Sequence, residues 1–276
     1  MNNEHAKTIA NYIQNISQII LEAFNKMYEV DYISYILYIG RASIMPGLKA
    51  LTGTDCVIDN LIEIFNDETR TKFYLRYLRR NYSKDGFCYD GDSGIDDLHV
   101  ELMIYAHLWD SHYFLKSLIR LAAIVSGKGY IWDAQVNWWR KEKKMQDCII
   151  IPIKNSGLEL GNLLEQCYRH EIRNAFAHSQ YSIDASRRLI CIRTDEGILT
   201  LKFDEFQEIF LKSVILMNKM ENLLERNHDA AAQMQTSITE VFKTPDGLPV
   251  QVYGEMVKRG KTLCPEFRLV RVKEDD

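Results

Sequence analysis

The sequence predicts a mostly α-helical protein with a small amount of antiparallel β-structure. Apolar residues recur at the three- and four-residue spacing of an amphipathic helix near the N-terminus, in residues 97–125 and again after Asp204. Two short apolar runs on either side of Arg193-Thr-Asp-Glu-Gly197 have the pattern of a β-hairpin. From Thr236 onward, apolar residues gather in short runs around the turn Pro245-Asp246-Gly247, which favours strands.

Residues 1–96 are predicted to form an N-terminal helical region. The first helix should span about residues 4–29, because Ile, Ala, Phe and Met side chains recur there on one face. The next apolar segment begins at Val30 and should stay helical up to Pro46, where proline removes a backbone donor. Asp55 is a candidate cap for a third helix, because its carboxylate can accept from the free amides of a helix N-terminus.

The middle of the chain is predicted to hold further helices. The Gly- and Asp-rich residues 82–96 should form a surface loop, since their acidic spacing does not fit a calcium-binding loop. Helices are then expected at residues 97–125, Asp133–Met145 and residues 158–178.

The last part of the chain combines strands with one long helix. Leu189–Ile192 and Ile198–Leu201 are the expected strands of the hairpin. Asp204, followed three residues later by Gln207, should cap the last long helix. Residues 228–235 should be a linker or a frayed extension of that helix. A small C-terminal β segment, residues 236–276, is expected to hold short strands at 238–242, 250–253 and 267–272.

The composition is that of an ordinary globular protein of 276 residues, with 46% hydrophobic and 26% charged residues. The formal charge of −4 does not favour nucleic-acid binding in general, so any contact with RNA requires a local basic patch. The six cysteines are scattered without a C-x-x-C pair, which favours buried free thiols. We find no signal-peptide pattern and no apolar run of membrane-spanning length, so a cytoplasmic protein without membrane contact is expected.

The most informative segment runs from Arg169 to Tyr181. Arg173, Asn174 and His178 lie on one polar arc of its predicted helix. This face presents a fixed cation, an amide and a histidine, the residue type that ordinarily titrates near neutral pH, and such a set suits phosphate chemistry. The opposite side forms an apolar stripe that can pack on the core: Tyr168, Ile172, Ala175 and Phe176.

Arg173-Asn174-x-x-x-His178 resembles the R-x4-6-H motif of the HEPN superfamily. These are helical proteins, many of them metal-independent endoribonucleases, and they are common among toxins and phage-defence effectors. The resemblance covers about residues 97–226 and implies a HEPN-type helical bundle over that range. It also implies RNA as the substrate, no cofactor, and a homodimer in which two motifs face each other across a shared cleft. A neutralising partner protein is compatible with a toxin role.

The resemblance implies that the RNA strand is cleaved by its own 2′-hydroxyl group. Arg173 would stabilise the phosphorane, His178 would transfer protons, and Asn174 would position the reacting groups. Two other interpretations remain open: a catalytically silent HEPN module that binds RNA or a protein partner, and a purely structural helical dimer. In the silent module the same polar face holds a ligand without reacting. If the motif has no function, His178 is an ordinary surface histidine and Arg173 pairs with Glu171 or Glu165.

Further residues are candidates for RNA contact. Tyr181 follows His178 by three residues, whereas some toxin members carry a tyrosine two residues after the histidine, so a packing role is the stronger interpretation. Arg140 and Lys141 follow two tryptophans, and stacking rings beside positive charges suit single-stranded RNA. The interpretation that the tryptophans belong to the core and the charges to a solvated helix end is the stronger one. No cluster of His, Cys, Asp or Glu has zinc-ligand spacing. The candidates are Arg169, His170, Tyr181, Arg140 and Lys141.

Overall fold

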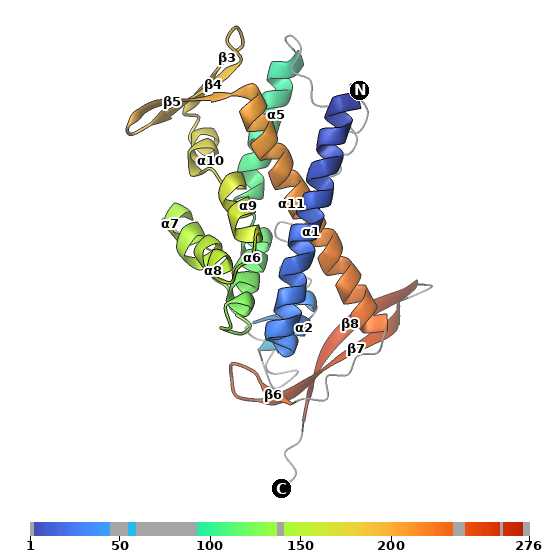
Figure 1. Cartoon of the computed structure of the whole chain (residues 1–276). Helices are drawn as coiled ribbons and strands as arrows, with labels where there is room; N and C mark the ends of the chain where they lie inside the picture. Colours follow the sequence, from blue (N-terminus) through green and yellow to red (C-terminus); the bar gives the residue numbers. More distant parts are fainter. Residues whose placement is uncertain are drawn as a thin grey trace.

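The computed structural model of the chain describes residues 3–44, 55–58, 93–136, 141–233, 241–259 and 262–272. Within these ranges the protein is mostly helical with small antiparallel sheets, which confirms the predicted fold class at this level. The helices form an elongated bundle with sheets toward both of its ends (Figure 1). They are α1 (Asn3–Val30), α2 (Tyr32–Ile39), α5 (Ser93–Leu108), α6 (His112–Val125), α7 (Lys141–Met145), the π-helix η1 (Gln146–Ile150), α8 (Ile151–Asn155), α9 (Leu160–Cys167), α10 (His170–Ala177) and α11 (Phe203–Gln233).

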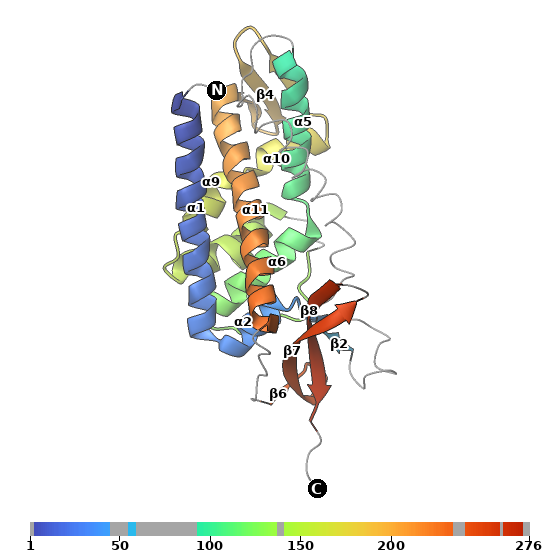
Figure 2. The same cartoon turned by 90° about the vertical axis from the view of Figure 1, so that its right-hand side faces the viewer.

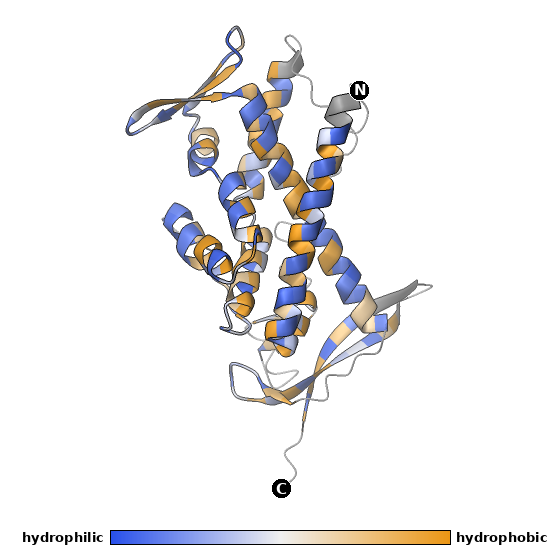
Figure 3. Ribbon diagram, in the orientation of Figure 1, coloured by the Kyte–Doolittle hydropathy of each residue, from blue (hydrophilic) through white to orange (hydrophobic). Residues whose placement is uncertain are grey.

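The two long helices α1 and α11 lie side by side along the bundle (Figures 1 and 2). α5 and α9 pack against α11 and α6 packs against α1, so these helices share one core. The largest fully buried side chains in that core include Trp109, Tyr105 and Phe206. Figure 3 shows alternating hydrophobic and hydrophilic stripes along the helices, as expected where each helix buries one face. Burial of these apolar faces is the main stabilising contribution.

The N-terminal helix is confirmed, and the next helix is shorter than predicted. α1 spans Asn3–Val30, but α2 ends at Ile39 and does not continue to Pro46. It ends there because the Ala42 amide turns back and donates to the Leu37 carbonyl at 2.9 Å, which closes the last helical turn.

Asp55 is followed by a strand and not by a helix. β1 (Ser43–Ile44) and β2 (Cys56–Val57) form a two-stranded antiparallel sheet, so the prediction that Asp55 caps a helix is wrong. The backbone directly after Asp55 is extended and pairs with β1, so it cannot also form the first turn of a helix. The rest of this predicted helix and residues 82–92 of the predicted loop lie outside the described residues.

The predicted helix at residues 97–125 is in fact two helices, α5 and α6. α5 already begins at Ser93, so the end of the predicted loop is helical. α6 begins anew because Ser111 is extended and its hydroxyl accepts from the Phe114 amide at 3.4 Å, as an N-cap does. This interruption places Asp110 between the two helices.

The predicted helix at Asp133–Met145 is only partly present. Residues 133–136 are not helical, residues 137–140 lie outside the described residues, and α7 begins at Lys141. The helix then continues through η1 into α8. Pro152, near the start of α8, has no amide to donate, and the wider π-helical turn before it accommodates that loss.

The last long helix is confirmed, but its predicted cap is wrong. α11 begins at Phe203, so Asp204 lies in the first turn and not at the cap position. There its carboxylate accepts from Arg188 at 3.3 Å, and a negative charge is favourable near a helix N-terminus. The helix continues to Gln233, so residues 228–233 are a helical extension, and residues 234 and 235 lie outside the described residues.

The predicted hairpin is confirmed as β4 (Leu189–Thr194) and β5 (Gly197–Lys202), and β3 (Tyr181–Asp184) adds a third strand that was not predicted. One face of this sheet packs on the bundle, because Ile190, Ile192 and Leu201 are almost fully buried. The alternation of side chains along each strand leaves the other face toward solvent.

A second three-stranded sheet packs against the C-terminal end of α11 (Figure 2). It consists of β6 (Phe242–Lys243), β7 (Pro249–Arg259) and β8 (Thr262–Arg271), which confirms the strands expected around Val250 and Phe267. Gly254 allows the close contact, because a Cβ atom there would lie 3.1 Å from the Cα atom of Ala232. No helix in the described ranges has the length and apolar character needed to cross a bilayer.

Candidate functional site around the Arg-Asn-His helix

The helix that carries the motif is shorter than predicted. The predicted helix at residues 158–178 is divided into α9 and α10, because the backbone is extended at Tyr168 and Arg169. The hydroxyl group of Tyr105, a fully buried residue of α5, bridges the break. It donates to the carbonyl of Cys167 at 2.8 Å and accepts from the amide of Arg169 at 2.8 Å.

This bridge replaces backbone hydrogen bonds that the interruption removes. Burial raises the pKa of Tyr105 well above its usual value, so the hydroxyl stays protonated and can donate and accept at once. The direction in which α10 leaves α9 therefore depends on a residue more than 60 positions earlier in the chain.

α10 is held against the bundle by the apolar stripe that the sequence predicts. Ile172 and Ala175 are almost fully buried, and Phe176 packs against the core. Just before the helix, the ring of Tyr168 contacts that of Trp109 with centroids 5.3 Å apart. The opposite, polar side of α10 is thus left for Arg173, Asn174 and the residues near them.

Arg173 is held by a carboxylate that sequence reasoning missed. Its Nε atom donates to both carboxylate oxygens of Asp110, at 3.0 and 3.1 Å, and its Nη2 atom donates to Oδ1 at 2.7 Å. Its Nη1 atom donates to the side-chain oxygen of Asn174 at 2.7 Å. The bonds to Asp110 engage the Nε–Nη2 edge of the guanidinium group, and the bond to Asn174 uses Nη1. One N–H bond remains on each of Nη1 and Nη2.

Asp110 also binds Lys141, one of the predicted RNA-contact residues, through its Oδ1 atom. Burial alone raises the pKa of Asp110, but the hydrogen bonds and charges of Arg173 and Lys141 outweigh it, so the pKa is lowered overall. Asp110 is therefore ionised at neutral pH and joins α7, α10 and the α5–α6 junction. No signal in the sequence indicated this role of Asp110, because the residue lies at a break between α5 and α6 where one continuous helix was predicted.

His178 occupies the C-cap of α10 and is exposed. The amides of Ser179 and Gln180 donate back to the carbonyls of Phe176 and Ala175, at 3.2 and 2.7 Å, which is the Schellman arrangement. Ser179 has a φ of 54°, in the left-handed region that usually favours glycine. The helix thus ends in a closed turn that presents His178 to solvent.

Asn174 contacts Arg173 and not His178 through its side-chain oxygen. Its backbone carbonyl accepts from the His178 amide at 3.0 Å. Asn174 therefore helps to fix the side chain of Arg173. In the described structure its side chain makes no hydrogen bond to the His178 imidazole, so it positions only one of the two reacting groups.

The predicted RNA-contact residues near α10 are engaged with other groups. Arg169 lies 3.5 Å from Glu171, and His170 lies 3.4 Å from Glu142. The ring of Tyr181 stacks on Phe176, and its hydroxyl group is 2.7 Å from Nδ1 of His99, which fits the packing role that its spacing favours. Arg140, the remaining candidate, lies outside the described residues.

The surroundings of α10 are therefore close to charge balance. Arg173 and Lys141 share Asp110, and Arg169 pairs with Glu171 and Glu205. The half-exposed pairs contribute little to stability, but they lower the positive potential that an RNA backbone would meet.

Comparison with protein-family models, with curated proteins and with solved structures finds no match for this chain. Its function is therefore inferred from the side chains described above and from the resemblance in the motif.

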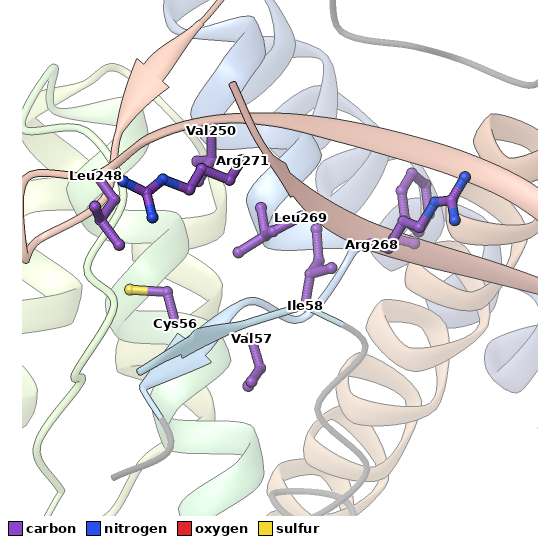
Figure 4. Close-up of a pocket in the computed structure, with 9 residues that line it drawn as sticks. Cys56, Val57, Ile58, Leu248, Val250, Arg268, Leu269 and Arg271 are labelled. Atoms are coloured by element: carbon purple, nitrogen blue, oxygen red, sulfur yellow. The ribbon is translucent and has the colours of Figure 1, made fainter. Parts of the chain in front are cut away.

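A cavity of about 200 Å³ lies far from the motif, between β2 and the C-terminal sheet (Figure 4). It is lined mainly by apolar side chains such as Ile58, Val250 and Leu269, with the Cys56 thiol and Arg271 beside them. No residue of α10 lines it. Among the described residues, no group of three or more His, Cys, Asp or Glu side chains is placed to hold a metal ion.

Proposed function

We propose that this protein is a metal-independent endoribonuclease of the HEPN type that acts as a homodimer, in the role of a toxin or phage-defence effector. The observation that carries the proposal is the arrangement on α10. A guanidinium group is held on one edge by Asp110 with its outer N–H bonds left for another acceptor, and an exposed histidine ends the same helix.

Cleavage of RNA by its own 2′-hydroxyl group needs these groups and no metal ion. A base removes the 2′ proton, the 2′ oxygen attacks phosphorus, and an acid protonates the 5′ oxygen as its bond to phosphorus breaks. The product ends are a 2′,3′-cyclic phosphate and a 5′-hydroxyl. Arg173 can stabilise the additional negative charge of the phosphorane with its remaining donors, and His178 can move a proton.

His178 is the exposed imidazole at the end of α10, and His170 at its start lies 3.4 Å from Glu142, whereas the reaction needs both a base and an acid. His178 of a second protomer across the shared cleft would supply the other group. A protein that is monomeric at micromolar concentration in sedimentation velocity, yet fully active, would contradict this part of the proposal.

The test is digestion of a labelled single-stranded RNA by purified protein in excess EDTA, with His178→Ala beside the wild type. We expect wild-type cleavage with cyclic-phosphate ends and an optimum near neutral pH, and almost none with the variant. Activity that appears only after addition of Mg²⁺ or Mn²⁺ would refute the proposal, as would equal activity of the variant.

A second candidate is a catalytically silent module that binds RNA or a protein partner. The charge balance around α10 favours it, because Arg169, His170 and Lys141, the basic RNA-contact candidates among the described residues, each lie beside a carboxylate. Expression in cells separates the two candidates. The endoribonuclease should be toxic, and His178→Ala should relieve the toxicity; a silent module should show no difference between the two proteins.

A further inference from the structure

The sheet β3-β4-β5 carries two more cations on its outer face, and the backbone of one of them, Arg193, bonds to the turn after His178. Its outer face is formed by the residues that alternate with the buried Ile190, Ile192 and Leu201. Arg193 and Lys202 lie on this outer face, and both are exposed. Figure 1 shows the sheet beyond the end of α10, where the chain leaves the helix.

Arg193 is tied by its backbone to the turn that follows His178. Its amide donates to the carbonyl of Gln180 at 2.9 Å, and Gln180 is two residues after His178. Register places Arg193 directly opposite Ile198, a hydrophobic side chain that is 75% exposed. An exposed guanidinium group and an exposed apolar side chain thus stand next to each other at the end of the sheet nearest His178.

The cations on this outer face differ from those around α10 in whether a carboxylate pairs with them. Arg173, Arg169 and Lys141 each lie within ion-pair distance of a carboxylate. Arg187 and Arg188, in the β3–β4 turn, pair with Asp184 and Asp204. Within the described part of the chain, Arg193 and Lys202 have no such partner, although Asp195 and Glu196 occupy the adjacent turn.

We propose that Arg193 is a substrate-binding residue that contacts the RNA phosphate backbone next to His178, and that Lys202 extends this contact along the outer face of the sheet. The inference rests on the proposed endoribonuclease function. An unpaired guanidinium group gives more affinity for a phosphate than one already paired with a carboxylate, because no ion pair has to be broken first. The exposed Ile198 offers an apolar surface for a base or ribose beside that phosphate.

The test measures binding of a fluorescent single-stranded RNA in a His178→Ala background, where cleavage is suppressed. Arg193→Gln should weaken binding roughly 5- to 10-fold and lower the salt dependence by about one phosphate contact. Arg193→Glu should weaken it further, and Lys202→Gln should have a smaller effect of the same sign. Arg187→Gln is the matched control, because it removes one positive charge from the turn between β3 and β4, at a residue already paired with Asp184.

The outcomes separate this inference from the function on which it rests. If the wild type neither binds nor cleaves RNA, the endoribonuclease proposal fails. If the wild type cleaves RNA but Arg193→Gln and Arg187→Gln bind it equally well, only the role of Arg193 is refuted. In a background with His178 intact, Arg193→Gln should raise KM and leave kcat nearly unchanged; a fall in kcat alone would also contradict a binding role.

Discussion

Replacing Tyr105 with phenylalanine tests whether one buried hydroxyl group sets the position of the motif helix. The change keeps the aromatic ring and removes only the hydroxyl group, so the lost hydrogen bonds outweigh any effect of the small void. It removes a 2.8 Å bond to the Cys167 carbonyl and a 2.8 Å bond from the Arg169 amide. Each buried backbone group left without a partner costs about 1–3 kcal/mol.

The two losses are not equal. The Cys167 carbonyl keeps a long 3.5 Å contact from the hydroxyl group of Ser213, which donates mainly to the Ile209 carbonyl at 2.8 Å. The Arg169 amide has no substitute in the described structure. We therefore expect Tyr105→Phe to lower the free energy of unfolding by about 2–4 kcal/mol, below the sum of two full penalties. The amide hydrogen of Arg169 should also exchange faster with solvent.

The matched control is Tyr38→Phe, at another buried tyrosine. Its hydroxyl bonds to the side chain of Ser117 at 2.7 Å and touches neither α9 nor α10, so a loss of about 1 kcal/mol is expected. The measurements are urea unfolding followed by circular dichroism, hydrogen exchange at Arg169 and RNA cleavage. If Tyr105→Phe is no less stable than Tyr38→Phe and exchange at Arg169 is unchanged, the hydroxyl bridge does not hold the break.

The remaining predictions concern the site itself. Ser179→Gly should stabilise the protein by about 1 kcal/mol, because Ser179 has a left-handed backbone. Gly157→Ser, at the corresponding position after α8, should destabilise it. Urea midpoints of both variants equal to that of the wild type would contradict this. The pKa of Asp110 is lower in the folded state than in the unfolded state. Its contribution to stability is therefore fully present above its unfolded pKa of about 4, and it is lost as the pH falls from there through the lower folded pKa. Asp110→Asn should therefore make the free energy of unfolding fall less steeply as the pH is lowered below about 4. An unchanged fall would show that other carboxylates cause the loss of stability in acid. His178→Ala should cost less than about 1 kcal/mol of stability but two to four decades of activity. Arg173→Ala should cost about 1–3 kcal/mol, since Asp110 loses its main donors, and Arg173→Lys should not restore activity; full activity of the lysine variant would exclude a two-pronged contact.

Local sequence patterns determined the elements that depend on neighbouring residues. The first helix, the last long helix, the hairpin and the apolar stripe of α10 follow from spacing, because a helix or strand that buries one face must repeat its apolar residues with that period. The end of α6 at Val125 was also predicted, and there Gly127 adopts the left-handed conformation at little cost.

Tertiary contacts decided the ends and interruptions that the sequence predicted wrongly. α2 closes with Arg41 in the left-handed conformation, where glycine would have been the signal, so its end at Ile39 was not predicted. The break before α10 is stabilised by Tyr105 from another helix, so no periodicity within α9 and α10 records it.

The candidate site divides in the same way. The sequence by itself determined that Arg173, Asn174 and His178 share the polar side of one helix, because that depends only on helical geometry. Only the tertiary structure decided that Asp110 meets both Arg173 and Lys141, and that the backbone of Arg193 lies beside the turn after His178. Hydrogen bonds and ion pairs act over a few ångströms in space regardless of separation along the chain, so residues more than 30 or 60 positions apart become neighbours only when the bundle packs.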